Sequence, residues 1–251
     1  MTIDLLDVFE ARSGLVCAVG AGGKKTTLYA LARRHRGRIA LTATVYTTFF
    51  PDDLGAVSII DDEIHLGQKV AAHNEASRVA YARPGSKPGR HAGVSPHRIR
   101  EIHEASGFDA TFVKADGARM RWIKAPRSGE PLLPTPPCTV LVIASARALG
   151  EPLGDRIAHR ADHVAAVTGA ALGEIFQPRH LARLLSSDDG LLQGTTGHTV
   201  VPVINMVDDQ ERLEMARTAG ELALESTSRF DRVILARMRD ESNPVLEVVS
   251  R

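Results

Sequence analysis

Aromatic residues are scarce in this chain. They make up 4% of its 251 residues, with one Trp, three Tyr and seven Phe. A hydrophobic core can still form, because 43% of the residues are hydrophobic and a chain of this length buries a large share of its surface. We therefore expect a core built mainly from Val, Ile, Leu and Ala.

Cysteine is rarer still, and its placement excludes a disulfide-stabilised protein and a cysteine-ligated metal protein. Cys17 and Cys138 are the two cysteines of the sequence, and each lies in an apolar, strand-like run. Two such residues provide neither a disulfide framework nor the spacing of a cysteine metal site. We expect both to be small buried hydrophobic residues, as is typical of a reducing, intracellular protein.

The sequence also lacks an excess of either charge and any long apolar run. Lys and Arg number 31 against 30 Asp and Glu, for a net charge of +1. This balance predicts no general attraction to nucleic acid or to a membrane surface. No run approaches the roughly 20 apolar residues of a membrane span, and the first residues, Met1–Asp7, include no basic segment of a signal peptide. We expect a cytoplasmic protein with neither a nucleic-acid nor a membrane partner.

Short apolar strands alternate with helical segments along the chain, a pattern typical of βαβ units. The predicted fold class is α/β, a P-loop NTPase-like, mostly parallel sheet with helices on both faces. We expect a single nucleotide-binding domain over residues 1–251, with loop excursions at 83–96 and 126–137. The pattern predicts strands at 15–19, 38–42, 57–60, 79–82, 111–115, 139–144, 164–168, 200–204, 233–236 and 245–249, and helices at 26–35, 62–76, 96–106, 178–185 and 209–227.

A glycine-rich turn follows the first strand and leads into a helix, which is the context of a phosphate-binding loop. Glycines let consecutive backbone N–H groups point at one anion, and the helix N-terminus adds a partial positive charge. A lysine would hold the outer phosphates, and a threonine hydroxyl would ligate Mg²⁺. The predicted nucleotide-binding residues of this loop are Gly20, Ala21, Gly22, Gly23, Lys24, Lys25, Thr26 and Thr27.

The loop departs from the regular pattern, which places a glycine six residues before a Gly-Lys-Ser/Thr sequence. Position 18 is alanine, and Gly23-Lys24 is followed by Lys25 rather than by a hydroxyl residue. The sequence therefore leaves open which of Lys24 and Lys25 faces the phosphates. A glycine-rich turn with surface lysines is the alternative.

Polar residues follow two other predicted strands. Asp116 comes directly after the strand at 111–115, where open α/β sheets bind ligands. We expect Asp116 to hold Mg²⁺ together with Thr26, and Arg119 to stabilise transferred charge. Thr44, in a threonine-rich segment after the strand at 38–42, is expected to contact Mg²⁺ or phosphate. Turn-forming Asp-Gly and ordinary β-propensity are the respective alternatives.

Asn205 and Asp208 follow the strand at 200–204. Guanine-specific P-loop proteins carry Asn-Lys-x-Asp at this place, where the Asp accepts from guanine and the Asn steadies the base and the loop. Met206 replaces the lysine here. The pair favours GTP and leaves ATP open, and a helix N-cap is the alternative role for Asp208.

With these motifs, the chain resembles the YqeC family over roughly residues 15–208. The segments that carry the resemblance are Val-Gly-Ala-Gly-Gly-Lys at 19–24, the threonines of 42–48, Gly-Val-Ser-Pro at 93–96, Ala-Asp-Gly-Ala-Arg at 115–119, Lys-Ala-Pro at 124–126, Glu-Pro and Leu-Pro within 130–134, Leu-Gly-Glu-Pro-Leu at 149–153, His-Arg at 159–160, Gly-Glu-Ile at 173–175 and Asn-Met-Val-Asp at 205–208. The family usually has Thr at position 25, Glu at 114 and Lys at 206.

The resemblance implies an accessory protein for the maturation of a selenium-dependent molybdenum hydroxylase, with a hydroxylase subunit or a cofactor intermediate as partner. Together with the motifs, it predicts Mg²⁺-dependent binding of GTP or ATP followed by hydrolysis, with Lys24, Lys25, Asp116 and Arg119 as catalytic residues. The alternatives are a non-catalytic, nucleotide-gated binding or chaperone module and a small-molecule phospho- or nucleotidyltransferase. The sequence leaves open whether the protein is an enzyme.

Overall fold

The chain divides into two compact units, and the strand β1 (Gly14–Gly20) contributes residues to both. The computed structural model describes residues 4–251. Residues 1–3, part of the N-terminus that is expected to lack a signal peptide, lie outside this range. The first unit runs to Ala18 and includes Leu28–Asp116 and Leu132–Thr139. The second comprises Val19–Thr27, Gly117–Pro131 and Val140–Arg251.

The first unit has a sheet in the order β1-β7-β2-β5-β4, and its four neighbouring strand pairs are all parallel. Its elements are α1 (Leu5–Val8), most of α2 (Lys24–Arg34), β2 (Ile39–Ala43), β3 (Thr47–Thr48), the 3₁₀ helix η1 (Asp52–Leu54), β4 (Val57–Ile60), α3 (Glu63–Ala71), β5 (Arg78–Ala82), β6 (Arg90–His91), α4 (Pro96–Ala105) and β7 (Ala110–Lys114).

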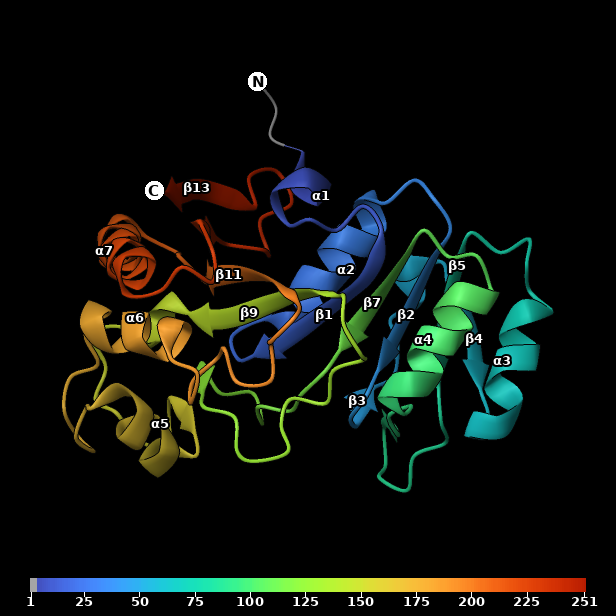
Figure 1. The fold of residues 1–251 in the computed structure, drawn as a ribbon, viewed down its shortest axis with the longest axis horizontal. Helices are drawn as coiled ribbons and strands as arrows, with labels where there is room; N and C mark the ends of the chain where they lie inside the picture. Colours follow the sequence, from blue (N-terminus) through green and yellow to red (C-terminus); the bar gives the residue numbers. More distant parts are fainter. Residues whose placement is uncertain (1–3) are drawn as a thin grey trace. The chain divides into compact units, whose positions relative to one another are not determined.

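The directions of the crossovers place helices on both faces of this sheet. Helix α2 joins β1 to β2 in one direction across the sheet, whereas α3 and α4 join β4 to β5 and β5 to β7 in the opposite direction. Parallel crossovers are nearly always right-handed, so opposite directions put α2 on one face and α3 and α4 on the other. Helices α3 and α4 accordingly pack side by side (Figure 1).

The second unit has the strand order β13-β12-β11-β9, followed by the end of β1. Strands β11 and β12 are parallel, and β13 pairs antiparallel with β12 at the edge. Helices α6 and α7 pack against each other (Figure 1). The elements are β8 (Ile123–Lys124), β9 (Thr139–Ser145), η2 (Ala146–Ala148), β10 (Ala158–His159), α5 (Ala161–Thr168), α6 (Pro178–Ser186), β11 (Thr199–Asn205), α7 (Gln210–Ser226), β12 (Arg232–Ala236) and β13 (Val245–Ser250).

The predicted fold class, α/β with a mostly parallel sheet, is confirmed. The prediction of a single domain over 1–251 stays a prediction. The predicted loop at 83–96 contains the short strand β6, and 126–137 holds no helix or strand.

The predicted strand at 164–168 is wrong, because these residues end helix α5. Val164, Val167 and Thr168 are its buried residues in this stretch, at the helical spacings of three and four. A short apolar run does not by itself distinguish a strand from a buried helix, which explains the error.

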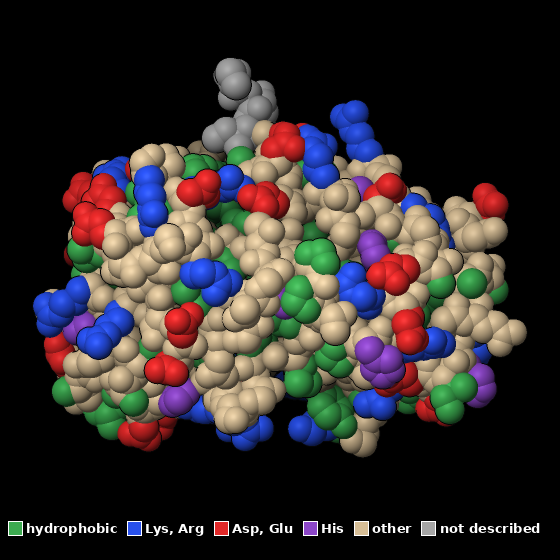
Figure 2. Space-filling view, viewed as in Figure 1, with side chains coloured by type: hydrophobic (Ala, Val, Ile, Leu, Met, Phe, Trp, Pro, Cys, Tyr) green, Lys and Arg blue, Asp and Glu red, His purple; other side chains and the backbone are tan. Residues whose placement is uncertain are grey.

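The core consists mainly of aliphatic side chains, and both cysteines are buried within it as free thiols. Basic and acidic side chains are interspersed on the face shown in Figure 2, as the balanced composition predicts. Among residues 4–251, no helix combines the length and the apolar character that a membrane span requires.

Candidate functional site

The glycine loop approaches β9 so closely that a side chain is excluded at Gly20 and at Gly22. Gly20 and Gly22 have φ of 86° and 89°, a conformation that favours glycine. A Cβ atom on Gly20 would lie 2.1 Å from the carbonyl oxygen of Ile143, and one on Gly22 would lie 2.6 Å from the Cβ of Ser145. The amide of Ala21 donates to the Ile143 carbonyl oxygen at 2.8 Å. The loop is therefore fixed against β9 by both geometry and hydrogen bonding.

Helix α2 begins at Lys24, directly after the loop. The Thr27 amide donates to the Gly23 carbonyl oxygen at 2.9 Å, which is a helical hydrogen bond of the first turn. In any α-helix the amides ahead of this point have no carbonyl one turn earlier, and they face out of the N-terminus. Because the helix dipole is positive at this end, the loop and the first turn together form a setting suited to an anion.

The structure distinguishes the two lysines at the helix start. The Lys24 side chain is buried, and its Nζ donates back to the carbonyl oxygen of Gly20, so it reaches across the loop. Lys25 is half-buried. A lysine ammonium group that lies over the loop can contact a phosphate bound there. Lys24 is therefore the better candidate of the two for the phosphate-binding lysine.

The two threonines that follow, Thr26 and Thr27, also differ in burial and in their contacts. The Thr27 hydroxyl donates to the Gly23 carbonyl oxygen at 3.2 Å, and the residue is fully buried. Thr26 is half-buried and lines a small surface pocket beside the loop. Thr27 therefore closes the first turn of α2, whereas Thr26 lines the pocket beside the loop.

Asn205, at the end of β11, supports the loop through a hydrogen bond to its backbone. It is 2% exposed, its Nδ2 donates to the Gly22 carbonyl oxygen at 2.7 Å, and its Oδ1 accepts from the Met238 amide at 3.0 Å. Both ends of this side chain are engaged with backbone, so Asn205 ties the glycine loop to the segment after β12. The expectation that the Asn steadies the loop matches this geometry, and a base contact by Asn205 stays a prediction.

Asp208 forms an ion pair in the pocket beside the loop. Its Oδ2 lies 2.6 Å from Nη2 of Arg147, and the two side chains are 37% and 41% exposed. Met206, Arg237, Met238 and Arg239 line the same pocket. The sequence did not single out Arg147 or Arg237. Each nevertheless follows a strand, β9 or β12, by the same rule that pointed to Asp116.

Asp116 and Thr44 belong to the first unit, at the ends of neighbouring strands. Asp116 is 2% exposed and follows Ala115, whose amide donates to the Ala18 carbonyl oxygen at 3.0 Å. The Thr44 amide donates to the Lys114 carbonyl oxygen, and its buried Oγ1 has no hydrogen-bond partner within residues 4–251. The predicted Mg²⁺ ligands Thr26 and Asp116 thus come from different units, and their pairing stays a prediction.

A charge cluster around the buried Lys124 holds the chain that follows Asp116. Lys124 is fully buried, and its Nζ donates to the Gly117 carbonyl oxygen at 3.0 Å and to Glu130 Oε2 at 2.8 Å. Arg160 donates to both oxygens of Glu130, at 2.9 and 3.0 Å. The predicted catalytic residue Arg119 is exposed two residues beyond Gly117, with φ of 45°. Lys124 therefore fixes the first residue of the segment that carries Arg119.

The Glu130 carboxyl group is strongly acidic in this cluster. Burial raises its pKa, but the hydrogen bonds and charges of Arg160 and Lys124 outweigh that effect and lower the pKa from 4.5 to about 2. The folded protein therefore favours the ionised form of the Glu130 carboxyl group.

Three further polar side chains, away from the glycine loop, are engaged with neighbouring groups. His163 lies 2.6 Å from the Pro126 carbonyl oxygen, and the Glu174 carboxylate accepts from the Ala171 amide at 2.9 Å. Lys87 lies over the Tyr46 ring in the segment around β3 and β6. Within residues 4–251, no group of three or more His, Cys, Asp or Glu is placed to hold a metal ion.

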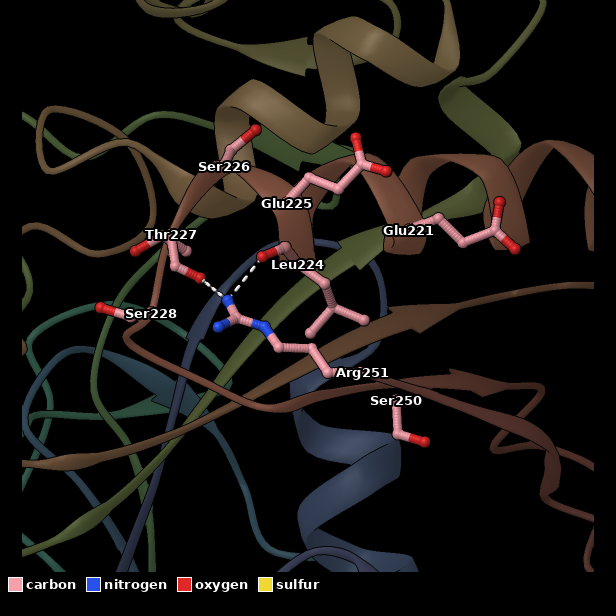
Figure 3. Close-up of a pocket in the computed structure, with 8 residues that line it drawn as sticks. All are labelled: Glu221, Leu224, Glu225, Ser226, Thr227, Ser228, Ser250 and Arg251. Carbon is pink, nitrogen blue, oxygen red and sulfur yellow. Dashed lines mark hydrogen bonds between the residues drawn. The ribbon is translucent and has the colours of Figure 1, made fainter.

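A second surface pocket, at the end of α7, is poorly suited to phosphate. The Arg251 guanidinium there donates to the carbonyl oxygens of Leu224 and Thr227, while Glu221 and Glu225 point away from it (Figure 3). Its arginine is engaged with backbone, and its two carboxylates would repel an anion. The glycine loop is therefore the better candidate site.

The close approach of the loop to β9 predicts that Gly22→Ala destabilises the protein more than Gly150→Ala does. Both glycines have positive φ, but a Cβ on Gly150 meets nothing within 4 Å. Both variants incur backbone strain, and Gly22→Ala adds overpacking that costs about 1–3 kcal/mol more. Urea unfolding measures the difference, and equal losses would contradict the described packing.

The acidity of Glu130 predicts a pH dependence. Because the folded-state pKa is below the unfolded value, Glu130 stabilises the protein above about pH 4.5 and loses this effect as the pH falls toward about 2. Glu130→Gln should therefore be less stable than the unsubstituted protein at pH 6, and the gap should narrow as the pH falls through this window. Urea unfolding from pH 6 to pH 3 measures it; a constant gap would refute the assignment.

Comparison with known proteins identifies the family. A family model described as YqeC protein matches residues 16–162, a stretch that includes the loop, Thr44, Asp116 and the charge cluster but ends before Asn205. The chain is also similar to the uncharacterized protein YqeC of Escherichia coli (strain K12), with 26% identity over 183 residues, or 72% of this chain and 71% of that protein. Since the model covers more than half of the sequence, the chain belongs to the YqeC protein family.

Proposed function

We propose that the chain binds the phosphate tail of a Mg²⁺–nucleoside triphosphate on the loop Gly20–Thr27. The observation that carries the proposal is the combination of a glycine turn packed against β9, a helix N-terminus and the buried Lys24 that reaches across the loop to Gly20. Each of these favours an anion at the same place. On binding, Lys24 would exchange the Gly20 carbonyl oxygen for phosphate oxygens, and the amides of the first turn would donate to the same group.

We propose that Mg²⁺ binds together with the phosphates of the nucleotide. Mg²⁺ usually keeps several waters and is held by one or two protein oxygens together with the phosphates of the substrate. A site of this kind needs no cluster of protein ligands. Thr26 would offer its hydroxyl, since Thr27 uses its own within the helix, and Asp116 would offer a carboxylate.

Membership of the YqeC family supports the finer part of the proposal, that the nucleotide is hydrolysed during maturation of a selenium-dependent molybdenum hydroxylase. Arg119, exposed beyond the anchored Gly117, would stabilise transferred charge. A binding module would leave the nucleotide intact, and a transferase would move a phosphoryl or nucleotidyl group to an acceptor. The fate of the nucleotide therefore separates the three functions.

The base would lie in the pocket that Met206, Asp208 and Arg237 line beside Thr26. Met206 and Met238 offer polarisable apolar surface, and Asp208 can accept hydrogen bonds from guanine once its ion pair with Arg147 rearranges. Asp208 therefore favours GTP over ATP.

The proposal predicts that Lys24→Ala weakens binding of Mg²⁺ with a non-hydrolysable GTP analogue about 10- to 100-fold, the loss expected for one charge-assisted contact. The matched control is Lys69→Ala, which removes a 56% exposed lysine of α3 and should change affinity less than about twofold. Isothermal titration calorimetry measures both. Unchanged affinity in Lys24→Ala, in a protein whose circular dichroism is unaltered, would contradict the proposal.

The base assignment predicts that GTP displaces a fluorescent nucleotide analogue better than ATP does, and that Asp208→Ala removes this preference. We expect the ratio of the two competition constants to fall about tenfold or more, because the carboxylate contact is lost. Arg147→Ala controls for the broken ion pair and should affect both nucleotides alike. A preference that persists in Asp208→Ala would refute the assignment.

A further inference from the structure

A polar cleft of the second unit lies among residues that the proposed nucleotide site does not use. Its volume is about 780 Å³, which is within the range of small-molecule sites, and all of its lining residues belong to this unit. Its walls are α5, the end of α6, the loop that follows α6 and the turn at 128–131. Helices α5 and α6 pack against each other (Figure 1). The cleft is therefore large enough for a ligand of its own.

The turn that forms one wall is held in place by hydrogen bonds to its carbonyl oxygens. The Glu130 amide closes the turn by donating to the Arg127 carbonyl oxygen at 2.9 Å. Gln193 Nε2 donates to the carbonyl oxygens of Arg127 and Glu130, at 2.8 and 2.5 Å. His163 Nε2 donates to the Pro126 carbonyl oxygen. The acceptor groups of this wall are thus engaged with the protein itself.

The amide donors of the same wall are not engaged. In a turn closed in this way, the amides of the two central residues, Ser128 and Gly129, take no part in the closing bond. Within residues 4–251, neither amide has a hydrogen-bond acceptor, and the Gly194 amide in the loop after α6 has none either. A Cβ atom on Gly129 would meet nothing within 4 Å, so this part of the wall is open. The wall therefore offers hydrogen-bond donors to a ligand.

Arg183, on α6, brings a positive charge into the cleft. Its guanidinium lies beside the end of α5, where Nη1 would be 3.3 Å from a Cβ atom on Gly169. Among the residues that the structure describes, 4–251, this guanidinium has neither a hydrogen bond nor an ion pair. Arg179, one turn earlier on the same helix, is instead paired with Glu174 at 3.2 Å. Arg183 is therefore available to an anionic ligand.

Two carboxylates also line the cleft, and neither cancels this charge. Glu130 lies within 3.3 Å of three cationic side chains, those of Lys124, Arg127 and Arg160. The wall around Glu130 is consequently positive overall. Asp189 is exposed, so solvent screens its charge. The cleft therefore favours an anion, and a doubly charged anion most.

We propose that this cleft binds a phosphorylated small molecule, with its phosphate monoester group at Arg183 and at the amides of Ser128 and Gly129. A phosphate monoester carries a charge of about −1.5 to −2 at pH 7, and its oxygens accept several hydrogen bonds. Guanidinium groups commonly bind phosphate through two parallel hydrogen bonds. The organic part of the ligand would pack against the apolar side of the cleft, which consists of Pro131, Ala166 and Val167.

The test measures binding of phenyl phosphate to the full chain by isothermal titration calorimetry, and ¹H–¹⁵N NMR locates it. Saturable binding should shift the amide resonances of Gly129 and Gly194. Phenyl phosphate should bind at least about threefold more tightly than inorganic phosphate, which lacks the organic group, and than benzoate, which has a single charge. Lys24→Ala should bind it as the unsubstituted chain does. A failure of nucleotide binding at the glycine loop would therefore leave this result unchanged.

Two arginine variants of α6 test the phosphate contact. Arg183→Gln should weaken binding of phenyl phosphate about tenfold or more, because a charge-assisted contact is lost. Arg179→Gln is the matched control: it makes the same change of charge on the same helix, outside the cleft, and should change affinity less than about twofold. Circular dichroism verifies the fold of both variants.

Three results would overturn the proposal. The first is that phenyl phosphate leaves the amide resonances of Gly129 and Gly194 unshifted. The second is that Arg183→Gln and Arg179→Gln weaken binding equally, since a general loss of positive charge would then explain the effect. The third is that benzoate or inorganic phosphate binds as tightly as phenyl phosphate.

Discussion

The close approach of the glycine loop to the backbone of β9 is the constraint on which the candidate site depends. Gly20 and Gly22 allow it, because a Cβ at either position would overlap Ile143 or Ser145. With the loop held there, the helix that follows starts at Lys24 and presents its N-terminus beside the loop. Asn205 completes the arrangement through its bond to Gly22, and a second bond to Met238 connects the loop to the segment after β12. Sequence, backbone conformation and electrostatics thus favour an anion at one place.

Lysines in this chain serve two different roles. Lys124 is fully buried, paired with Glu130, and bonded to the carbonyl oxygen of Gly117. Removing Glu130 would leave the buried Lys124 charge unpaired, which is costly, so the role of the pair is to hold one conformation of the segment after Asp116. Lys24 is also buried, and its Nζ donates to a carbonyl oxygen of the loop itself. An anionic ligand can replace that contact, whereas nothing comparable can replace Glu130.

Much of the fold could be predicted from the sequence, because apolar strands, glycine turns and capped helices are local signals. The strand β1, the loop after it and the helix α2 follow from that reasoning. The residues 164–168 did not, since a short apolar run fits either a strand or a helix. The ion pair of Arg147 with Asp208 and the hydrogen bond of Asn205 to Gly22 depend on pairings between segments far apart in the sequence. No local pattern encodes such pairings, so the structure was needed to find them.

The most direct test of the central claim is a crystal structure of the protein with Mg²⁺ and a non-hydrolysable nucleoside triphosphate. The account predicts phosphate oxygens at the amides of Gly22–Thr26, with Lys24 Nζ moved from the Gly20 carbonyl oxygen to the phosphates. It also predicts that Asn205 keeps its bond to Gly22, since that bond supports the loop rather than the ligand. A triphosphate bound elsewhere, with Lys24 still on Gly20, would contradict the account.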